Sequence, residues 1–392
     1  MSTELAYVLI TPYSLLKSRT GGIISRLLLL TDLEFVGARM YWPNDAFVDR
    51  YVETIKEQHL DPEAEHLLVN YLNDYFRRDN RLGISNRTFL LLFKGENAVE
   101  TLRRDVVGSF TSNVQGDSVR GTYGDYLVGR DGKVEMFEPA VLTGTDLRSN
   151  RKQLQILADF AKSDGGIIEK AVRFKPEEKP ETTLVIIKPD AFKRRSAKPG
   201  NIIDIFSKTG LYVVGAKLLR LSVAQAEEFY GPLRAMFVQR LKSNVERALA
   251  ARVQGSFGFT ITTDQISAMA DVLKEENAQF EFDRIVEYMS GRSSRTITSP
   301  EERSAPGTVK ALALLYRGID AIAKIRDRLG STDPSKAAEG TVRSDFGFDL
   351  MKNGAHASDS VESAERERKI VGLWPDNEEP SILPHIREYL GT

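Results

Sequence analysis

The sequence contains the same series of short motifs twice, and this repeat restricts the fold more than any other feature. Five segments recur in the same order: YVLITP ending at Pro12 and LVIIKP ending at Pro189, GGII (21–24) and GNII (200–203), VGA (36–38) and VGA (214–216), SVRGTYG (118–124) and TVRSDFG (341–347), and TGTD (143–146) and HASD (356–359). A repeat of this length indicates a duplicated structural unit. We therefore expect two copies of one domain in tandem.

The spacing of the matched segments shows where the two copies differ. The first three pairs lie about 178 residues apart, the fourth 223 and the last 213. The second copy has therefore gained about 45 residues in its middle, and the first about ten near its end. The polar stretch RFKPEEKPETT, with two prolines, is typical of a linker. We expect a first domain at 1–172, a linker at 173–183 and a second domain at 184–392, with insertions at about 237–279 and 292–308.

Hydrophobic patterns in the second copy indicate alternating strands and helices. The segments expected to be strands are TLVIIK (183–188), LYVVGAKLLRL (211–221) and VKALALLY (309–316), and those expected to be helices are NIIDIFSKTG (201–210), VAQAEEFYGPL (223–233) and GIDAIAKIRDRLG (318–330). With a closing strand near His356, the order is βαββαβ, which is typical of a ferredoxin-like α+β domain with an antiparallel sheet. The insertion at 237–279 has helical periodicity, whereas 292–308 has the composition of a loop.

Composition excludes several classes of function. The net charge of the 392-residue chain is −1, so we expect no broad affinity for nucleic acid or membranes. The chain has no cysteine, which excludes disulfides and thiolate chemistry. No apolar run reaches the ~18 residues of a membrane helix, and MSTELAYVLITPYS does not have the pattern of a signal peptide. We expect a cytoplasmic protein. The motifs GxxxxGK[ST], GxGxxG after a strand and HExxH are also missing.

His356 is one of four histidines, and its surroundings suit a nucleophile. A neutral imidazole can hold a phosphoryl group near pH 7. Gly354 and the flanking alanines leave room for a bulky anion, and the SDSVESAERE segment that follows opens a helix whose N-terminus attracts phosphate. Glu367 lies one to two turns into that helix and could orient a ring nitrogen. A lone histidine at a strand end, however, more often has no chemical role, so the other residues must decide.

Cationic side chains elsewhere in the second copy could hold phosphates. Lys188 ends a strand, at the sheet edge. Arg326 and Arg343 could bind phosphate oxygens bidentately, and the hydroxyl of Thr332 could add a hydrogen bond. Taken singly, each is more often an ordinary surface residue.

Two aromatic residues could contact a base. Phe282 in FEFDRIVEYM and Tyr230 in EEFYGPL each carry a ring whose face can stack on any base. Core packing is the more common use of such rings.

Taken together, the second copy resembles nucleoside diphosphate kinase over about residues 181–376, apart from the two insertions. The resemblance rests on the following segments: IIKPDA, GAK, FDRIVEYM, LGSTDP, GTVRSDFG and NGAHASDSVESAERE. The last is close to the family's signature. The resemblance implies transfer of the γ-phosphoryl group of ATP or another nucleoside triphosphate to a nucleoside diphosphate, by a ping-pong mechanism through a phosphohistidine.

The resemblance also implies a role for each matched residue. His356 would be the nucleophile and Glu367 its orienting partner, while Lys188 would serve both catalysis and phosphate binding. The other nucleotide-binding residues would be Tyr230, Phe282, Arg326, Thr332, Arg343 and Asn353. Mg²⁺ would be bound mainly through the nucleotide's phosphates, without a dedicated protein site.

The first copy looks like a degenerate version of the same domain. Thr11 stands at the lysine position, Thr143 aligns with the histidine, and the asparagine position falls at about Ala140, while Arg104 and Arg120 remain. Without a nucleophile this copy would be structural or regulatory. Its expected task is to pair with the second copy as an intrachain pseudo-dimer, and such chains would form homo-oligomers. An alternative for the whole chain is a non-catalytic nucleotide-binding regulatory or scaffold protein whose insertions close the site.

Overall fold

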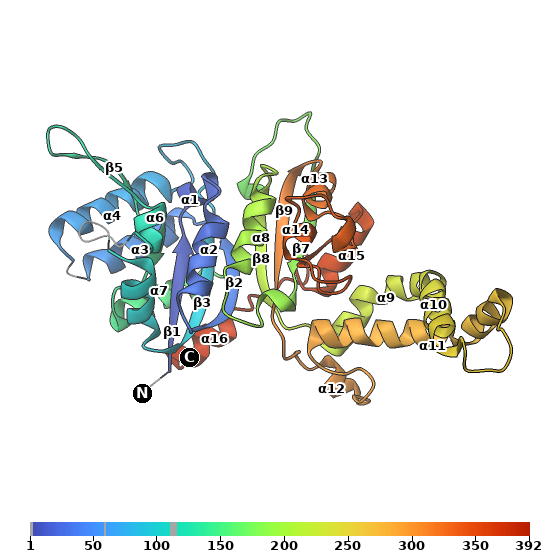
Figure 1. The fold of residues 1–392 in the computed structure, drawn as a ribbon. Coiled ribbons are helices and arrows are strands. Elements are labelled where there is room, and N and C mark those ends of the chain that lie inside the picture. The colour runs from blue at the N-terminus through green and yellow to red at the C-terminus, as the bar shows by residue number, and fades with distance from the viewer. Residues whose placement is uncertain (1–2, 59, 110–115) are drawn as a thin grey trace. The chain divides into compact units, whose positions relative to one another are not determined.

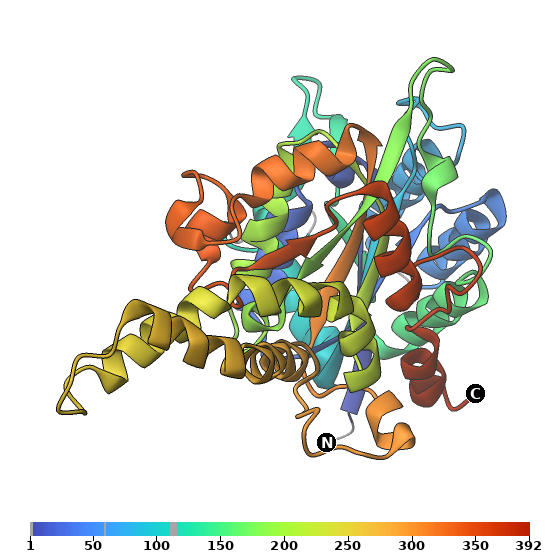
Figure 2. The same ribbon diagram turned by 90° about the vertical axis from the view of Figure 1, so that its right-hand side faces the viewer.

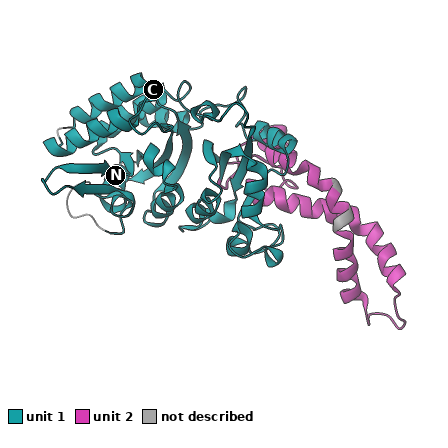
Figure 3. Cartoon of the chain, turned by 90° about the horizontal axis from the view of Figure 1, so that it is seen from above, with its two compact units in different colours: residues 1–219, 312–392 teal, residues 220–311 magenta. Residues whose placement is uncertain are grey.

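The computed structural model describes residues 3–58, 60–109 and 116–392 (Figure 1). The chain forms two compact units (Figure 3). The first consists of residues 1–219 and 312–392 and contains both sheets of the repeat, while the second consists of residues 220–311.

The first sheet of the larger unit has the strand order β2-β3-β1-β6, and its recorded pairings are antiparallel. The strands are β1 (Thr3–Ile10), β2 (Glu34–Tyr41), β3 (Thr88–Glu96) and β6 (Val141–Thr143). The helical segments of this half are α1 (Pro12–Leu16), α2 (Thr20–Leu29), α3 (Asp45–Lys56), α4 (Pro62–Tyr75), α5 (Ala98–Glu100), the π-helix η1 (Thr101–Val107), α6 (Val119–Tyr123) and α7 (Leu147–Asp159). A hairpin of β4 (Asp125–Val128) and β5 (Val134–Glu138) occupies the stretch where the first copy is longer.

The second sheet has the order β10-β7-β9-β8, with β7 (Pro180–Ile187), β8 (Tyr212–Leu219), β9 (Ala311–Ile319) and β10 (Ala355–Ala357). Its helical segments are η3 (Pro189–Ala191), α8 (Lys198–Ser207), α13 (Ala321–Leu329), η4 (Pro334–Lys336), α14 (Val342–Phe346), α15 (Val361–Ile370) and α16 (Leu383–Leu390). When the strands are counted within each sheet, the fourth strand (β6 or β10) lies beside the first (β1 or β7). The third strand (β3 or β9) and the second (β2 or β8) follow in that order. This is the ferredoxin-like order predicted from the repeat, so the α+β fold class is confirmed.

Helices α2 and α8, one from each half, pack closely against each other in the larger unit. A Cβ added to Gly21 would lie 2.4 Å from the carbonyl oxygen of Gly200, and one added to Gly200 would lie 2.1 Å from that of Gly21. Ser25 Oγ also donates to the carbonyl of Ala197 at 3.0 Å. The glycines of the GGII and GNII repeats therefore allow two helix backbones to approach each other.

The C-terminal helix packs on the first half of the chain. Ile382 and Ile386 are fully buried in the core that contains Tyr7 of β1, and α16 lies against α7 (Figures 1 and 2). The end of the predicted second domain at 184–392 thus completes the core of the first sheet. At the other predicted boundary, β7 begins at Pro180, inside the stretch 173–183 interpreted as a linker.

The second unit, residues 220–311, contains both predicted insertions and is built from α9 (Val223–Arg240), α10 (Lys242–Val253), α11 (Thr263–Ser290) and α12 (Pro300–Ser304). Ser222 with Gln225 and Thr262 with Gln265 form capping boxes that begin α9 and α11. Most of the segment 237–279 is helical, as its periodicity predicts, with a break at 254–262, while 292–308 contains the short helix α12 in addition to loop.

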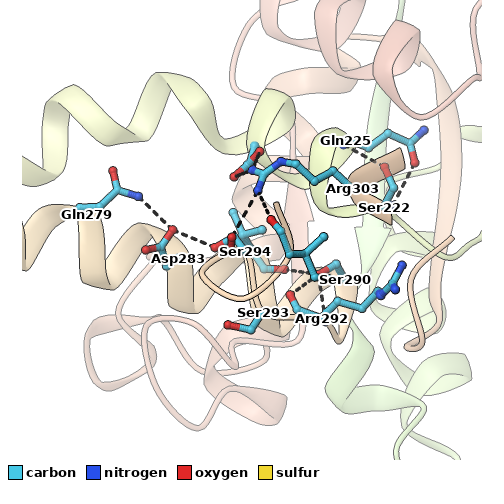
Figure 4. Close-up of polar contacts among 12 residues, drawn as sticks. Ser222, Gln225, Gln279, Asp283, Ser290, Arg292, Ser293, Ser294 and Arg303 are labelled. Atoms are coloured by element: carbon cyan, nitrogen blue, oxygen red, sulfur yellow. Dashed lines mark hydrogen bonds and ion pairs between the residues drawn. The ribbon is translucent and has the colours of Figure 1, made fainter. Parts of the chain in front are cut away.

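Polar contacts fasten the 292–304 segment within this unit (Figure 4). Ser294 Oγ donates to Asp283 of α11 at 2.8 Å, and Arg303 forms an ion pair with Glu227 of α9 and donates to the carbonyl of Ile297 at 2.7 Å. The loop predicted from composition is therefore held to two helices.

Candidate active site

His356 lies at the centre of β10, on the edge of the second sheet, where it is paired with Ile186 of β7. Its Nε2 is 2.8 Å from Oε2 of Glu367, and Ser358 Oγ donates to the same oxygen at 2.7 Å. Glu367 is 4% exposed, whereas 21% of the histidine side chain is exposed. Ser360 begins α15 by accepting a hydrogen bond from the backbone N–H of Ser363, and this start sets the helix turn that carries Glu367.

Lys188 follows directly after β7 and lies in a network with Asn353. Its Nζ donates to Asn353 Oδ1 at 2.6 Å and to the carbonyl of Met351 at 3.0 Å, and Asn353 Nδ2 donates to the carbonyls of Thr332 and Leu350 at 3.1 Å each. Burial, and after it the charge of nearby Arg343, lowers the pKa of Lys188 to about 7. A negatively charged ligand would stabilise the protonated amine.

Lys188 and His356 belong to the same face of the sheet. Directly paired residues share a face, as do residues two apart along a strand, so Lys188 follows Ile186 to the side of His356. Diagonal neighbours of this kind are on the order of 7–8 Å apart. The Lys188 backbone N–H donates to the carbonyl of Gly354 at 3.0 Å, which ties the two strand ends together.

Arg343 and Thr332 extend this network. Arg343, in α14, is 8% exposed and donates through Nη1 to the carbonyl of Gly330 at 3.0 Å and to Thr332 Oγ1 at 3.3 Å. Arg326 is exposed on α13. The pKa of Asp359 is lowered, first by a hydrogen bond from Ser363 and further by the charge of Arg326. A continuous chain of contacts thus joins Lys188, Asn353, Thr332 and Arg343. Arg326 lies near enough to Asp359, three residues after His356, for its charge to lower that pKa.

Tyr230 and Phe282 belong to the second unit. Both side chains are buried, with Phe282 only 4% exposed. The guanidinium of Arg234 lies 5.9 Å from the centroid of the Phe282 ring, and the rings of Phe229 and Tyr230 are 4.9 Å apart. Their contact with a base stays a prediction.

The first half has different residues at the matching positions. Leu142 of β6 pairs with Leu9 of β1, as His356 pairs with Ile186, so the alignment of Thr143 with the histidine is wrong by one residue. Thr143 follows it and donates to the carbonyl of Tyr7 at 2.7 Å. The alignment was misled because TGTD and HASD match by small and polar residues, whereas strand pairing sets the structural equivalence.

The position assigned to asparagine is also shifted. The backbone N–H of Thr11 donates to the carbonyl of Ala140, as that of Lys188 does to Gly354. Ala140 and Gly354 both have positive φ, at 60° and 81°. Ala140 therefore matches the glycine, and Pro139 stands at the asparagine position.

Sequence reasoning missed Glu138, which lies beside Thr11. Glu138 Oε1 accepts from Thr11 Oγ1 at 2.5 Å and from the N–H of Ala140 at 3.0 Å, and Oε2 accepts from the Tyr71 hydroxyl at 2.5 Å. Burial raises the pKa of Glu138 to about 7. Of the two arginines expected to remain, Arg120 donates to the carbonyl of Gly108 at 2.6 Å, as Arg343 does to Gly330, whereas Arg104 is exposed and bonded to Asp105. Ser358 was also missed, although it lies two residues after His356.

Two absences hold for the described residues 3–58, 60–109 and 116–392. Their acidic and histidine side chains form no group of three or more that could hold a metal ion. None of their helices has the length and apolar character needed to cross a membrane.

Comparisons with known proteins agree on one family. The family model described as nucleoside diphosphate kinase matches residues 181–251 and 270–373. The nucleoside diphosphate kinase of Helicobacter pylori strain P12 is 32% identical over 187 residues, which are 48% of this chain and 91% of the relative. That of Pasteurella multocida is also 32% identical, over 48% of this chain and 90% of its own.

Solved structures give matches over the same share of the chain. The Aquifex aeolicus nucleoside diphosphate kinase has 27% identity and a TM-score of 0.31, covering 49% of this chain and 95% of its own. An NDP kinase from Pyrobaculum aerophilum has 25% identity and a TM-score of 0.35, with the same coverage.

Proposed function

The chain belongs to the nucleoside diphosphate kinase family, and we propose that it transfers the γ-phosphoryl group of a nucleoside triphosphate to a nucleoside diphosphate through phospho-His356. The family assignment supports a nucleotide-dependent phosphotransferase. The ping-pong mechanism and the residue roles are our proposal.

The contact between His356 and Glu367 is the single observation that carries the proposal. An ionised carboxylate only accepts hydrogen bonds, so Nε2 donates its proton to Glu367 and the lone pair lies on Nδ1. Ser358 holds the same carboxylate oxygen. The ring is thereby set in one tautomer and one orientation, with Nδ1 as the nucleophile.

The first half-reaction then follows. The Nδ1 lone pair attacks the γ-phosphorus, the bond between that phosphorus and the β,γ-bridging oxygen breaks, and the nucleoside diphosphate leaves with the electron pair. Nε2 keeps its proton and its bond to Glu367 throughout. A second nucleoside diphosphate attacks the phosphohistidine through its terminal oxygen and reverses these steps.

Cationic residues provide most of the remaining catalysis. Phosphoryl transfer depends on positioning and on neutralising charge at the phosphate oxygens. We assign the phosphates to Lys188, Arg343 and Arg326, with Thr332 adding a hydroxyl. Asn353 positions Lys188 through the 2.6 Å contact and also faces the sugar. Because Lys188 has a pKa of about 7, binding of phosphates at higher pH would take up a proton.

The base and the metal complete the proposed complex. Stacking on Phe282 would accept any base, because it reads no edge groups, and Tyr230 would contribute a further contact with the nucleotide. The family implies Mg²⁺, which we expect the nucleotide's phosphates to carry. When bound, it supplies charge neutralisation at the phosphate oxygens.

The first half serves a structural role in this proposal. We infer that the two copies form an intrachain pseudo-dimer, supported by the close packing of α2 on α8. We place the domain boundaries near 172 and 184, with the insertions as additions to the second copy, and expect whole chains to assemble into homo-oligomers.

Labelling with γ-³²P ATP tests the function. We expect acid-labile, alkali-stable label on the protein, discharged by CDP or GDP. His356→Ala should remove the label completely, because the nucleophile is gone, while His66→Ala, on α4 of the first half, should label like the unchanged protein. A chain that binds ATP tightly but takes no label would instead be a nucleotide-binding scaffold.

A further inference from the structure

An acidic residue from the first half contacts the helix that carries Glu367. Glu169 belongs to the short 3-10 turn η2 (Glu169–Ala171), which precedes β7. Its Oε1 is 2.8 Å from Nη2 of Arg368 in α15, and its Oε2 is 3.5 Å from Nη1 of Arg317 in β9. One carboxylate thus bridges a strand and a helix of the second half.

The 3-10 turn itself is anchored to the sheet. The backbone N–H of Ile168 donates to the carbonyl of Val214 in β8 at 2.8 Å, and Ile168 is 6% exposed. Arg317 also donates to Thr182 Oγ1 of β7 at 2.9 Å. The turn that carries Glu169 is therefore fixed to β8 by the residue next to it in the chain, and the partly exposed carboxylate contacts Arg317 of β9, which is itself bonded to β7.

Arg368 is largely buried, so its charge depends on a nearby carboxylate for compensation. Only 8% of its side chain is exposed, and burial lowers the pKa of its guanidinium while Glu169 acts to raise it. Its Nε donates to the carbonyl of Leu373 at 3.2 Å, and its guanidinium lies 5.0 Å from the Trp374 ring. A buried cation held by a carboxylate moves little, since displacement would separate the charges.

Arg368 is the residue immediately after Glu367. Successive residues of an α-helix point about 100° apart. Glu367 therefore points toward His356 and Ser358, while Arg368 points toward Glu169, and the same turn of α15 is fixed from two sides.

We propose that Glu169 is a positioning residue for phosphoryl transfer: its bond to Arg368 fixes the turn of α15 that carries Glu367, and so fixes the His356 ring. This rests on the proposed function and adds a contribution of the first half and its connection to β7. A reacting group displaced by about 1 Å can lose about 100-fold in rate. The loss of one of the two restraints on this turn should allow a smaller displacement and lower the rate by about tenfold.

The test uses the full chain and single-turnover labelling by ATP. Glu169→Gln keeps the shape of the side chain but removes its charge. We expect a rate constant at saturating ATP lower by about tenfold, with the ATP concentration for half-maximal rate unchanged within twofold. Arg368→Gln removes the same pair from the other side and should give the same loss, which also covers the case that one variant does not fold.

The matched control is Glu378→Gln. Glu378 also joins the C-terminal region to the first half, through a buried ion pair with Arg39 at 2.5 Å, but it lies outside α15. Its loss should lower the melting temperature and leave the rate constant within twofold. An equal rate loss in Glu378→Gln would overturn the proposal, because general loosening would then explain both effects.

A double mutant shows whether Glu169 acts through Glu367. In a Glu367→Gln background, Glu169→Gln should change the rate by less than twofold. Independent, multiplying losses would overturn the proposal. The ring ¹⁵N shifts of His356 give a readout without turnover: the unchanged protein should show the single tautomer with the proton on Nε2, and Glu169→Gln should populate the other tautomer as well. An unmoved spectrum overturns the proposal even if the chain shows no kinase activity, whereas absence of label in the unchanged protein refutes the kinase function alone.

Discussion

The two halves of the larger unit have the same strand order but different side chains at the matching edge of the sheet. In the second half, Lys188 stands at the end of the first strand of the copy, opposite the strand that carries His356. In the first half, Thr11 and Leu142 occupy these positions. The comparison shows that the ferredoxin-like order brings the two strand ends together in both cases, whereas the side chains that stand there differ, and the proposed activity is assigned to those of the second half.

The buried polar groups show the contrast most clearly. The second half holds a buried amine, bonded to Asn353, that would be completed by an anion. The first half holds the Glu138 carboxyl, whose hydrogen bonds to Thr11, Tyr71 and the Ala140 N–H satisfy it internally. The buried carboxyl of the first half is thus hydrogen-bonded by groups of that half, whereas the buried amine of the second half donates to the neutral oxygens of Asn353 and Met351.

The largest expected effect comes from replacing Lys188 of the second half by threonine, the residue type that stands at the matching position, Thr11, in the first half. Lys188→Thr should lower the labelling rate by on the order of 100- to 1000-fold, as loss of one donor to a developing anion does elsewhere. The lysine's charge is lost, and Asn353 Oδ1 loses its 2.6 Å donor. Single-turnover labelling measures the rate. Thr11→Ser, which keeps the hydroxyl in the first half, should have no effect, and a Lys188→Thr rate close to that of the unchanged protein would show that the two edges are not functionally distinct.

The second prediction concerns stability, because the two buried groups should respond to pH in opposite ways. The pKa of Glu138 is raised from 4.5 to about 7, so between these values the folded chain binds more protons and stability falls as pH rises. The pKa of Lys188 is lowered from 10.5 to about 7, so above pH 7 the unfolded chain binds more protons and stability rises with pH.

Neutral variants isolate each contribution. Relative to the unchanged protein, Glu138→Gln should gain about 3 kcal/mol in unfolding free energy between pH 5 and pH 8. Relative to the unchanged protein, Lys188→Met should lose about 2 kcal/mol in unfolding free energy between pH 7 and pH 9. Denaturant unfolding at each pH measures both. Parallel pH profiles for a variant and the unchanged protein would mean that the group in question is not held in its buried, pKa-shifted state.

The smallest effect distinguishes the arginines that the repeat places at equivalent positions. In a His356→Ala background, which prevents turnover, Arg326→Ala should weaken ATP binding about tenfold, the usual cost of a charge-assisted hydrogen bond. Arg104→Ala should change it less than twofold, because Arg104 is exposed and already bonded to Asp105 at 2.6 Å. Calorimetric titration gives both values. Equal losses would indicate that the first half retains a nucleotide site.

The sequence by itself determined the fold class and the set of residues proposed for catalysis, and its repeated motifs predicted two sheets of the same strand order. Hydrophobic periodicity sets each element, and the βαββαβ order follows from the succession of elements. His356 and Glu367 are in contact because the turn and helix that separate them are local. Lys188 and Asn353 lie in motifs that the sequence identifies, but they meet through the pairing of β7 with β10.

Only the tertiary structure decided the rest. A shift of one residue separates Thr143 from Leu142, and the pairing of β6 with β1 resolves it, since local composition does not specify register to a single residue. The packing of α16 on the first core and the contact of Glu169 with Arg368, 199 residues away, depend on how distant segments meet. Such contacts are set by burial and charge pairing in the folded chain, and no spacing within one element contains them.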